Sequence, residues 1–463
     1  METQSIQEVF RRSNPITGRF VLPGDKSITH RALFFSALRE GRTIIHNPSS
    51  ARDCRNTYEL LESLGCCCET HKDHWVVDGS ARSVGPALMN IHFGNSGTTA
   101  RLAIGFLSGE RGTFSLTGDS SLSRRPMEHV TEPLRFLGAD IVTTDGKLPV
   151  TVIANRVISG LNEPAKAIEV SSAQVHAALT LAGLRSESGV RIRRIAPMRD
   201  HTLRMAKKFG LSIQTHDDLD QVYPVTEPNG LQGISHKRRG LSTKDPEPNV
   251  DLLIPGDVSS ASFLITAALL VSESDLQIHN VGLNPTRTGF LECVKGMGGK
   301  VSWKITDNEW EPRGSIHVQY SPGLHGIILD NSSHITPLMM IDELPLLAFL
   351  GTQANGETVI RDAGELRVKE SDRISATVAM MGSLGVKIEE LEDGFRLSGQ
   401  QKVSGGGRAD HRGDHRLAML AGVAGLIAEE PVIVPNPDVA GNSWPGFWDC
   451  EAWRFNLQSR FQY

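Results

Sequence analysis

Apolar and polar residues follow two alternating periods along this chain of 463 residues. Segments with apolar residues at helical spacing are followed by short segments that alternate as a half-buried strand does. The junction between them recurs, with Gly after an apolar residue, in LESLGCCCE, LRFLGADIV, AKKFGLSIQ, VKGMGGKVS and MGSLGVKIE. Because Gly readily takes the left-handed conformation that ends many helices, each junction predicts a helix stop and then a strand. Helices that alternate with strands predict the α/β class.

The same junctions indicate an internal repeat. They lie 72 to 88 residues apart, which is longer than a solenoid repeat, so each unit should be a small βα assembly. The segments PGDKSITHRAL and PGDVSSASFL also match at a separation of 232 residues. We therefore expect two similar halves of about three units each, joined near residues 245–254, with ligands in the cleft between them. The junction glycines are Gly65, Gly138, Gly210, Gly298 and Gly385.

Composition and charge narrow the class of protein. The chain is 39% hydrophobic and 22% charged, as soluble globular proteins are, and its formal net charge is −5. With no global basic field, nucleic acid is not an expected partner, and any anion site must be a local cluster of cations. The longest apolar runs, FLITAALLV and LAMLAGVAGLIA, are too short to span a membrane. The first 18 residues lack the apolar core of a signal or transit peptide.

Six cysteines without paired spacing predict free thiols in a reducing cytoplasm. The run of cysteines at 66–68, followed by His71 and His74, raises the alternative of a metal site. Neighbouring residues of a strand point to opposite faces, so three adjacent cysteines cannot all reach one ion. A second cluster of Asp and His within residues 410–415 is explained equally well by helix capping. We expect no metal.

The first PGD segment places two cations at the start of an apolar helix. Asp25 or Ser27 can cap this helix, and Lys26 and Arg31 then project near its N-terminus, where the helix dipole is already positive. Two cations there are unfavourable unless an anion binds; the alternative is a solvated helix start. The second PGD segment keeps the cap and drops both cations, which favours the anion site. No P-loop and no dinucleotide-binding glycine pattern is present.

Two further loops of the first half have the composition of anion sites. FGNSGTTARL places Gly94 and Gly97 where the backbone can approach a ligand closely, although this is also ordinary turn chemistry. In SLSRRPMEHV, Pro126 is expected at the first helical position, which would place Arg125 at a helix N-terminus. In VSSAQVHAAL, Ser172 and Gln174 offer neutral donors to a phosphate or polyol, or Ser172 simply caps the helix.

The second half supplies acidic residues. Asp342 and Glu343 lie between apolar runs, where a partly buried carboxylate can be tuned for proton transfer. If RVKESDRISA is helical, Lys369 and Arg373 share a face and Glu370 pairs with Arg373, which is also the usual pattern of a solvated charged face. Arg373 and Arg416 together would suit bidentate binding of a carboxylate or phosphate. These residues predict proton transfer on an anionic substrate.

In this order, the segments PGDKSITHRA, GNSGTTARL, LTGDSSLSRRP, SSAQVHAALTLAGL, RDHT, PGDVSSASF, IDELP, RVKESDR and GDHRLAM resemble the enolpyruvyl transferase family. The resemblance runs from Gly18 to Trp448 and is similar to the bacterial branch called class II. It implies an α/β fold of two similar domains, each of three βαβαββ units in an inside-out α/β barrel, with the active site in the interdomain cleft. The expected domains are residues 23–253, on the shikimate 3-phosphate side, and residues 1–22 plus 254–463.

The resemblance also implies an activity, the transfer of enolpyruvate from phosphoenolpyruvate to the 5-hydroxyl of shikimate 3-phosphate by addition and elimination. This is a step of the shikimate pathway toward chorismate and the aromatic amino acids. It implies neither metal nor organic cofactor. The implied catalytic residues are Asp342, Glu370 and Lys26. The implied shikimate 3-phosphate site is Lys26, Ser27, Arg31, Ser172, Gln174, Arg199, Asp342 and Lys369. The implied phosphoenolpyruvate site is Lys26, Gly97, Arg125, Gln174, Arg373 and Arg416, where glyphosate is expected to compete.

The chain departs from the family pattern at Asn442, His176 and Met198, where many relatives have Lys, Lys and Ser, and Asn442 could weaken phosphoenolpyruvate binding. The nearest rival is the sister transferase acting on UDP-N-acetylglucosamine, which usually carries a Cys in the loop that here is GDSSLSRRP. A ligand-binding homologue without catalysis is a second rival, against which the retained acids and cations argue. A kinase lacks support without a P-loop. We expect a cytoplasmic monomer acting on small molecules.

Overall fold

The computed structural model describes residues 6–9, 14–39, 41–79, 88–160, 166–225 and 250–453. The chain divides into two compact units, each considered by itself. The first unit is Lys26–Ile254, and the second unit is Met1–Asp25 with Pro255–Tyr463. Of the predicted join at 245–254, residues 245–249 lie outside the described residues. Helices and strands alternate through both units, so the predicted α/β class is confirmed.

The first unit contains six described α-helices and twelve strands. Its helices are α1 (Lys26–Ala37), α2 (Arg52–Ser63), α3 (Gly97–Leu107), α4 (Glu128–Phe136), α5 (Ala173–Gly183) and α6 (His201–Lys208), with a short 3₁₀ turn η2 (Leu122–Arg124). Its strands are β3 (Arg42–His46), β4 (Cys67–Thr70), β5 (His74–Asp78), β6 (Leu88–His92), β7 (Gly112–Thr117), β8 (Asp140–Thr144), β9 (Lys147–Ala154), β10 (Ile168–Val170), β11 (Val190–Arg194), β12 (Ile213–His216), β13 (Leu219–Val222) and β14 (Val250–Leu253).

The second unit has five described α-helices, α7 (Val258–Leu270), α8 (Gly289–Gly296), α9 (Leu344–Gln353), α10 (Arg373–Ser383) and α11 (His415–Gly425). Its 3₁₀ turns are η3 (Pro337–Met340), η4 (Gly364–Val368), η5 (Pro437–Asn442) and η6 (Glu451–Trp453). Its strands are β1 (Ile6–Val9), β2 (Thr17–Val21), β15 (Asp275–Gly282), β16 (Val301–Asp307), β17 (Arg313–Gln319), β18 (Ile328–Leu329), β19 (Glu357–Ile360), β20 (Glu389–Leu391), β21 (Gly394–Ser398) and β22 (Val432–Pro435).

Most strands belong to small sheets of one design. In the sheet β6-β7-β9-β8, the first two strands are parallel and the last two join antiparallel, and the elements follow the chain order βαβαββ. The sheets β10-β11-β13-β12 and β18-β19-β21-β20 have the same order. A shorter antiparallel pair, β1 with β22, completes the second unit. Within the described ranges, the strands form these separate mixed sheets and no closed barrel.

Two sheets contain an edge strand from a distant part of the sequence. β14 directly precedes α7 in the chain but pairs in parallel with β3 of the first unit. β2 precedes α1 but pairs in parallel with β15 of the second unit. β14 therefore belongs to the first unit and β2 to the second, and the chain passes from one unit to the other twice, after Asp25 and after Ile254.

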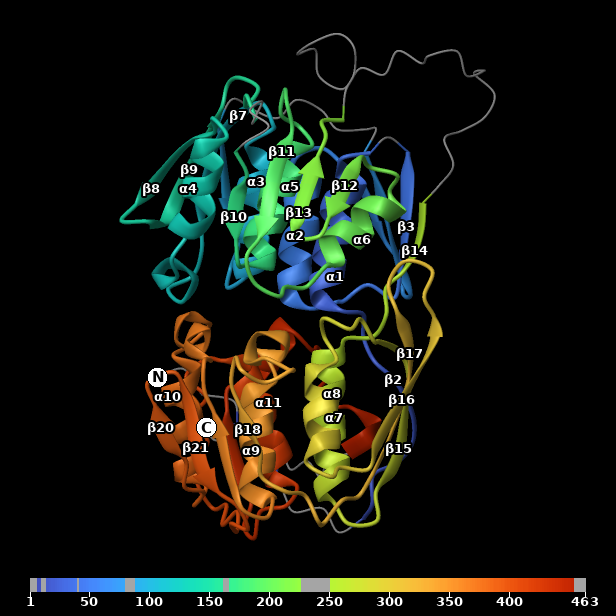
Figure 1. Cartoon of the computed structure of the whole chain (residues 1–463), viewed down its shortest axis with the longest axis vertical. Helices are drawn as coiled ribbons and strands as arrows, with labels where there is room; N and C mark the ends of the chain where they lie inside the picture. Colours follow the sequence, from blue (N-terminus) through green and yellow to red (C-terminus); the bar gives the residue numbers. More distant parts are fainter. Residues whose placement is uncertain are drawn as a thin grey trace. The chain divides into compact units, whose positions relative to one another are not determined.

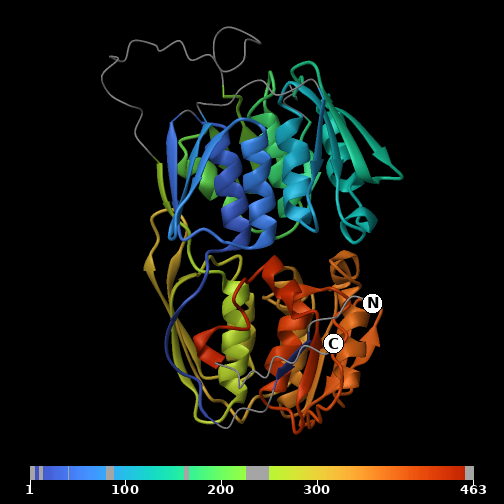
Figure 2. The ribbon, with the colours of Figure 1, turned by 180° about the vertical axis from the view of Figure 1, so that it is seen from behind.

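Within each unit the helices lie inside and the sheets outside (Figures 1 and 2). In the first unit α3 packs against both α1 and α5, and in the second α7, α9 and α11 pack against one another. The apolar runs noted in the sequence are these central helices, since α7 and α11 are buried around nearly their whole circumference. Such helices need no polar face because other elements cover every side. Among the described helices, none has the length and apolarity needed to cross a membrane.

The junction glycines end their helices as predicted. All five have positive φ, between +68° and +95°, so the predicted helix stops are confirmed. Another glycine controls packing between helices. A Cβ on Gly105 of α3 would lie 2.2 Å from the backbone oxygen of Ala178 on α5. Any side chain at residue 105 would push the two helices apart, and their N-termini carry several candidate site residues.

Candidate active site

The N-termini of α3 and α5 are joined by side-chain hydrogen bonds in the first unit. Ser172 caps α5 by accepting a bond of 3.3 Å from the Gln174 backbone N–H, which confirms the capping interpretation. The Gln174 amide donates to Thr98 Oγ1 over 3.0 Å and accepts from Arg101 Nη1 over 2.8 Å. Gln174 is thereby fixed between the two helices, and partly buried donors gather at their positive ends.

Arg31 links α1 to the same region. Its side chain is buried, with 3% exposure of the residue, and Nε donates to Thr202 Oγ1 over 2.8 Å. Its guanidinium also donates to the carbonyl oxygens of Ser27 at 2.9 Å and of Ala173 at 3.3 Å. Arg199 lies half-buried in the loop before α6, three residues ahead of Thr202. The predicted residues Ser27, Arg31 and Arg199 therefore belong to one neighbourhood around the N-termini of α1, α5 and α6.

Lys26, the first residue of α1, is held by a carboxylate that sequence analysis did not identify. Its Nζ lies 2.8 Å from Asp53 Oδ2 in the first turn of α2, and both side chains are only 10–12% exposed. No sequence signal marks Asp53, because the contact depends on how α1 packs against α2.

Arg125 is buried beside the loop that contains Gly97. Its Nη2 donates to Asn95 Oδ1 over 2.5 Å and to Ser121 Oγ over 3.2 Å. A Cβ on Gly97 would lie 3.0 Å from Arg125 Nη1 and 3.1 Å from Arg101 Nη1. Gly97 therefore leaves room for both guanidinium groups at the start of α3.

The expected helix start at Pro126 is wrong. The helix α4 begins at Glu128, and Arg125 follows the 3₁₀ turn η2 in an extended conformation. The backbone N–H of Met127 donates to the carbonyl of Gly146 over 2.7 Å, in the turn between β8 and β9. The position of Pro alone therefore placed the helix start two residues too early, within the usual uncertainty of helix boundaries.

In the second unit, Asp342 lies between η3 and α9 and contacts two arginines. Its Oδ1 is 3.4 Å from Arg373 Nη1, and its Oδ2 is 3.6 Å from Arg416 Nη2. The carboxylate is 17% exposed, against 1% for Arg373 and 9% for Arg416, so it is the accessible member of the group. The predicted residues Asp342, Arg373 and Arg416 are thus brought together.

Arg373 is the most deeply buried cation of the described site. It lies 2.5 Å from Glu370 Oε2 and 2.8 Å from Asp414 Oδ2. Burial alone would lower the pKa of this guanidinium, but the carboxylates of Asp414, Glu370 and Asp342 raise it above its ordinary value, so Arg373 stays charged. Asp414 also caps α11 by accepting from the Arg416 backbone N–H over 2.9 Å, which confirms the capping interpretation of the 410–415 cluster.

The prediction that Lys369, Glu370 and Arg373 share one helix is wrong. Lys369 and Glu370 lie in the loop between η4 and α10, and the helix starts at Arg373. Asp372 is the reason, because its carboxylate caps the helix by accepting from the Ser375 backbone N–H. Lys369 Nζ instead pairs with Glu365. Glu370 does contact Arg373, as predicted, but it does so from the loop before α10 and not from a position on the same helix.

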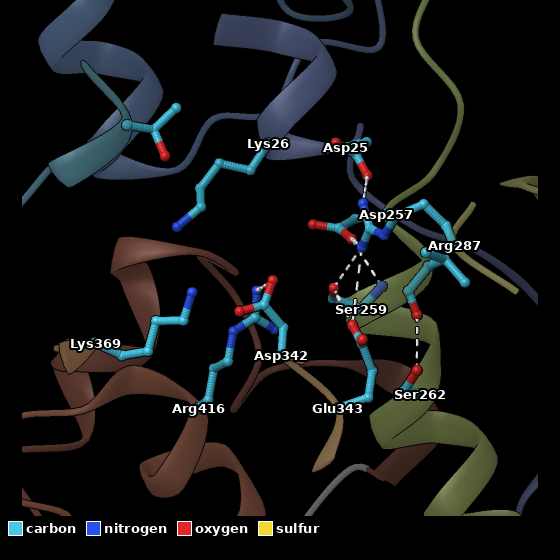
Figure 3. Close-up of polar contacts among 12 residues, drawn as sticks. Asp25, Lys26, Asp257, Ser259, Ser262, Arg287, Asp342, Glu343, Lys369 and Arg416 are labelled. Atoms are coloured by element: carbon cyan, nitrogen blue, oxygen red, sulfur yellow. Dashed lines mark hydrogen bonds and ion pairs between the residues drawn. The ribbon is translucent and has the colours of Figure 1, made fainter. Parts of the chain in front are cut away.

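A second group of buried charges was missed by sequence analysis. Arg287, just before α8, lies among Asp25, Asp257 and Glu343 (Figure 3). The sequence indicates its acidic members, as the residue after Gly in each PGD segment and as Glu343 next to Asp342, but it does not indicate the arginine that they share. Asp257 does cap α7, accepting from the Ser259 backbone N–H over 2.8 Å. In the described part of the chain, His, Cys, Asp and Glu form no group of three or more that could hold a metal ion.

These arrangements support distinct chemistry in the two units. The first unit offers cations and helix N-termini, which are groups that favour phosphate binding. The second unit offers an accessible carboxylate held by guanidinium groups, which suits proton transfer next to a developing negative charge.

Comparison with known proteins agrees with this chemistry. The family described as EPSP synthase (3-phosphoshikimate 1-carboxyvinyltransferase) matches residues 10–450. A 3-phosphoshikimate 1-carboxyvinyltransferase of Thermotoga neapolitana is 40% identical over 94% of this chain and 96% of its own length. One from Staphylococcus haemolyticus is 36% identical over 96% of this chain and 97% of its own length.

Solved structures extend the comparison. An EPSP synthase from Acinetobacter baumannii has a TM-score of 0.78 at 31% identity, covering 96% of this chain and 97% of its own. The enolpyruvyl transferase NikO from Streptomyces tendae, at 15% identity and a TM-score of 0.72 over 99% of both chains, shares the fold. On the family match and these relatives, the chain belongs to the EPSP synthase (3-phosphoshikimate 1-carboxyvinyltransferase) family.

Proposed function

We propose that the site residues described above carry out the reaction of this family. The chain transfers the enolpyruvyl group of phosphoenolpyruvate to the 5-hydroxyl of shikimate 3-phosphate and releases phosphate, a step of the shikimate pathway. The observation that carries the residue assignment is the carboxylate of Asp342, accessible yet held by Arg373 and Arg416.

Residues around the helix N-termini of the first unit bind the anionic groups. Lys26, Ser27, Arg31, Ser172, Gln174 and Arg199 bind shikimate 3-phosphate, together with Asp342 and Lys369 of the second unit. Lys26, Gly97, Arg125 and Gln174 bind phosphoenolpyruvate, together with Arg373 and Arg416. The burial of Arg31 and Arg125 supports these roles, because a buried cation binds an anion with little competition from water.

Asp342 is the general base of the addition step. The 5-hydroxyl oxygen forms a bond to C2 of phosphoenolpyruvate, and its proton passes to Asp342. The two ion pairs support this role, because they restrict the carboxylate to one orientation before the substrate arrives.

Glu370 exchanges the proton at C3. In the addition step C3 accepts a proton from Glu370, and in the elimination step C3 returns it while the bond from C2 to the phosphate oxygen breaks. The contact of Glu370 with Arg373 supports this role, because it holds the carboxyl group beside the cation that stabilises the departing phosphate. Lys26 adds a second cation to the reacting phosphate.

We also propose the domain boundaries, a cytoplasmic location and a monomeric state. Residues 23–253 and residues 1–22 plus 254–463 form the two domains, supported by the division of the chain into compact units near these boundaries. All six cysteines are free thiols, which supports a cytoplasmic location. The monomeric state stays a prediction that size-exclusion chromatography with light scattering can test.

Phosphate release with defined substrates tests the function. The purified chain should release phosphate when given phosphoenolpyruvate and shikimate 3-phosphate together, and none when shikimate 3-phosphate is omitted. A parallel reaction with UDP-N-acetylglucosamine as acceptor separates this activity from that of the sister transferase. The proposed reaction would be excluded if phosphate is released only with the nucleotide sugar. It would also be excluded if no phosphate is released with either acceptor.

A further inference from the structure

Arg287 is enclosed by oxygen atoms from three segments of the second unit, which contain Asp25, Asp257 with Ser259, and Glu343 (Figure 3). The residue is 3% exposed. Its Nη1 donates to Asp25 Oδ2 over 3.2 Å, and its Nη2 donates to Ser259 Oγ over 2.7 Å. The Ser259 hydroxyl in turn donates to Glu343 Oε1. The guanidinium therefore reaches Glu343 through one hydroxyl, and also directly at 3.8 Å.

The charges of this group do not balance. One guanidinium faces three carboxylates, those of Asp25, Asp257 and Glu343, and each of these side chains is at most 8% exposed. Burying unpaired charge is costly, and a purely structural contact would be met at least as well by apolar side chains. Burial, with the neighbouring Asp25 carboxylate adding to it, raises the pKa of Asp257, which lessens the imbalance by favouring its protonated form.

The same arginine sits where the chain passes between units. The backbone N–H of Asp25 donates to Pro255 over 2.8 Å, and that of Asp257 donates to Pro23 over 3.0 Å. Both passing segments are thus hydrogen-bonded to each other, and Arg287 contacts the side chain that follows the PG pair in each. Asp25 is also the residue directly before Lys26 in the chain.

Glu343 connects this cluster to the proposed base. It is the first residue before α9, with its backbone N–H bonded to Met340 and its carbonyl accepting from Leu347. Asp342 is one peptide bond away, and its carboxylate contacts Arg373 and Arg416. With the Glu343 side chain fixed on one face and the arginines holding Asp342 on another, the dipeptide has little rotational freedom left.

We propose that Arg287 is a positioning residue for the reaction, acting on Asp342 through Ser259 and Glu343. This inference rests on the proposed role of Asp342 as the base. Arg287 touches no reacting atom. It fixes the turn that presents Asp342, and its positive charge favours the ionised form of the neighbouring carboxylates. Other charged groups around Asp342 are Arg373, Arg416 and Glu370, which remain in place when Arg287 is changed.

Two variants separate positioning from folding. Arg287→Lys keeps one positive charge but loses the rigid fork that reaches Asp25 and Ser259 together. The double variant Arg287→Met with Glu343→Gln has the same formal charge as the parent, because it removes one cation and one anion. Arg396→Lys is the matched control, since Arg396 is 40% exposed on β21 and pairs with Glu357 and Glu389. Asp342→Asn serves as the reference for loss of the base.

The readouts are kcat, KM for phosphoenolpyruvate, the pH profile of kcat, and the melting temperature. We expect Arg287→Lys to lower kcat about tenfold and the double variant about a hundredfold, as misplacement of a reacting group does. The KM should stay within about twofold, because no proposed ligand of phosphoenolpyruvate changes. The acidic limb of the kcat profile should move to higher pH in a single Arg287→Met variant, because this change removes a cation near the base and keeps the Glu343 carboxylate. Arg396→Lys should match the parent.

The outcomes distinguish this inference from the function on which it rests. Folded Arg287 variants with the kcat and acidic limb of the parent overturn the positioning role alone. A loss of kcat that follows the loss of melting temperature, with an unmoved pH profile, also overturns it in favour of a structural role. If Asp342→Asn keeps the turnover of the parent, the base assignment fails, and the inference fails with it.

Discussion

Replacing Gly97 with alanine is the sharpest test of the phosphoenolpyruvate site in the first unit. The new methyl group would lie 3.0 Å from Arg125 Nη1 and 3.1 Å from Arg101 Nη1. Ordinary carbon contacts begin near 3.4 Å, so both guanidinium groups must move by a few tenths of an ångström. Asn95 and Ser121 restrain Arg125 from the other side, which leaves it little room to move without losing a bond.

The size of the effect follows from these contacts. A hydrogen bond to a charged group contributes roughly 1.5–3 kcal/mol, and a displaced one keeps part of this. A loss of about 1 kcal/mol corresponds to roughly a fivefold weaker affinity. The fold itself should not weaken, because Gly97, the first residue of α3, is not among the glycines with positive φ, so alanine can adopt its backbone conformation. Binding and stability are therefore predicted to change independently.

Steady-state kinetics and thermal unfolding check both parts. We expect the KM for phosphoenolpyruvate to rise about fivefold, with kcat within about twofold, because Gly97 moves no proton. The inhibition constant for glyphosate, expected from the family resemblance to compete at this site, should rise at least as much. The melting temperature should be unchanged or slightly higher. Gly382→Ala is the matched control, since its Cβ would meet nothing within 4 Å inside helix α10.

The result that would refute this reasoning is specific. A Gly97→Ala variant with the KM and glyphosate inhibition constant of the parent would remove Gly97 and Arg125 from the phosphoenolpyruvate site. A variant that binds poorly only because it unfolds would show a lowered melting temperature, and the expectation that alanine fits the backbone at residue 97 would then be wrong.

Three further predictions concern carboxylates. Asp342→Ala should lower kcat at least a hundredfold while shikimate 3-phosphate still binds in calorimetry; turnover within a few-fold of the parent would contradict the base role. Asp53→Ala should raise the KM of both substrates about fivefold, because Lys26 loses the carboxylate 2.8 Å away that orients it; unchanged KM values would show that Lys26 needs no such support. Asp257→Asn keeps the α7 cap to Ser259 and should raise the melting temperature at pH 8. Because burial raises the pKa of Asp257, its protonated form favours the fold, and stability is lost as the pH rises through that raised value. The gain should therefore shrink as the pH falls, and a gain that grows at low pH would contradict the argument.

Local patterns along the chain determined the class of fold and the chemical type of the site. Helix ends at five glycines could be predicted from the sequence, because the left-handed conformation that ends a helix favours glycine at a single position. The helix caps at Ser172 and Asp414 could also be predicted, because the side chain of each cap accepts a hydrogen bond from a backbone N–H only two residues later. Family resemblance supplied the reaction and its residues, on motifs that are short and continuous.

Contacts between distant segments were decided only in the tertiary structure. The backbone N–H of Met127, just before α4, bonds to a turn 19 residues later, a contact that no local pattern indicates. The pairing of Lys26 with Asp53 depends on how α1 packs against α2. The pairing of β14 with β3, and of β2 with β15, joins strands that lie far apart in the sequence. No sequence pattern distinguishes Arg287 from other arginines, and its burial among three carboxylates is visible only in the structure. Local propensity acts over a few residues, whereas burial and charge pairing depend on neighbours that folding brings from elsewhere in the chain.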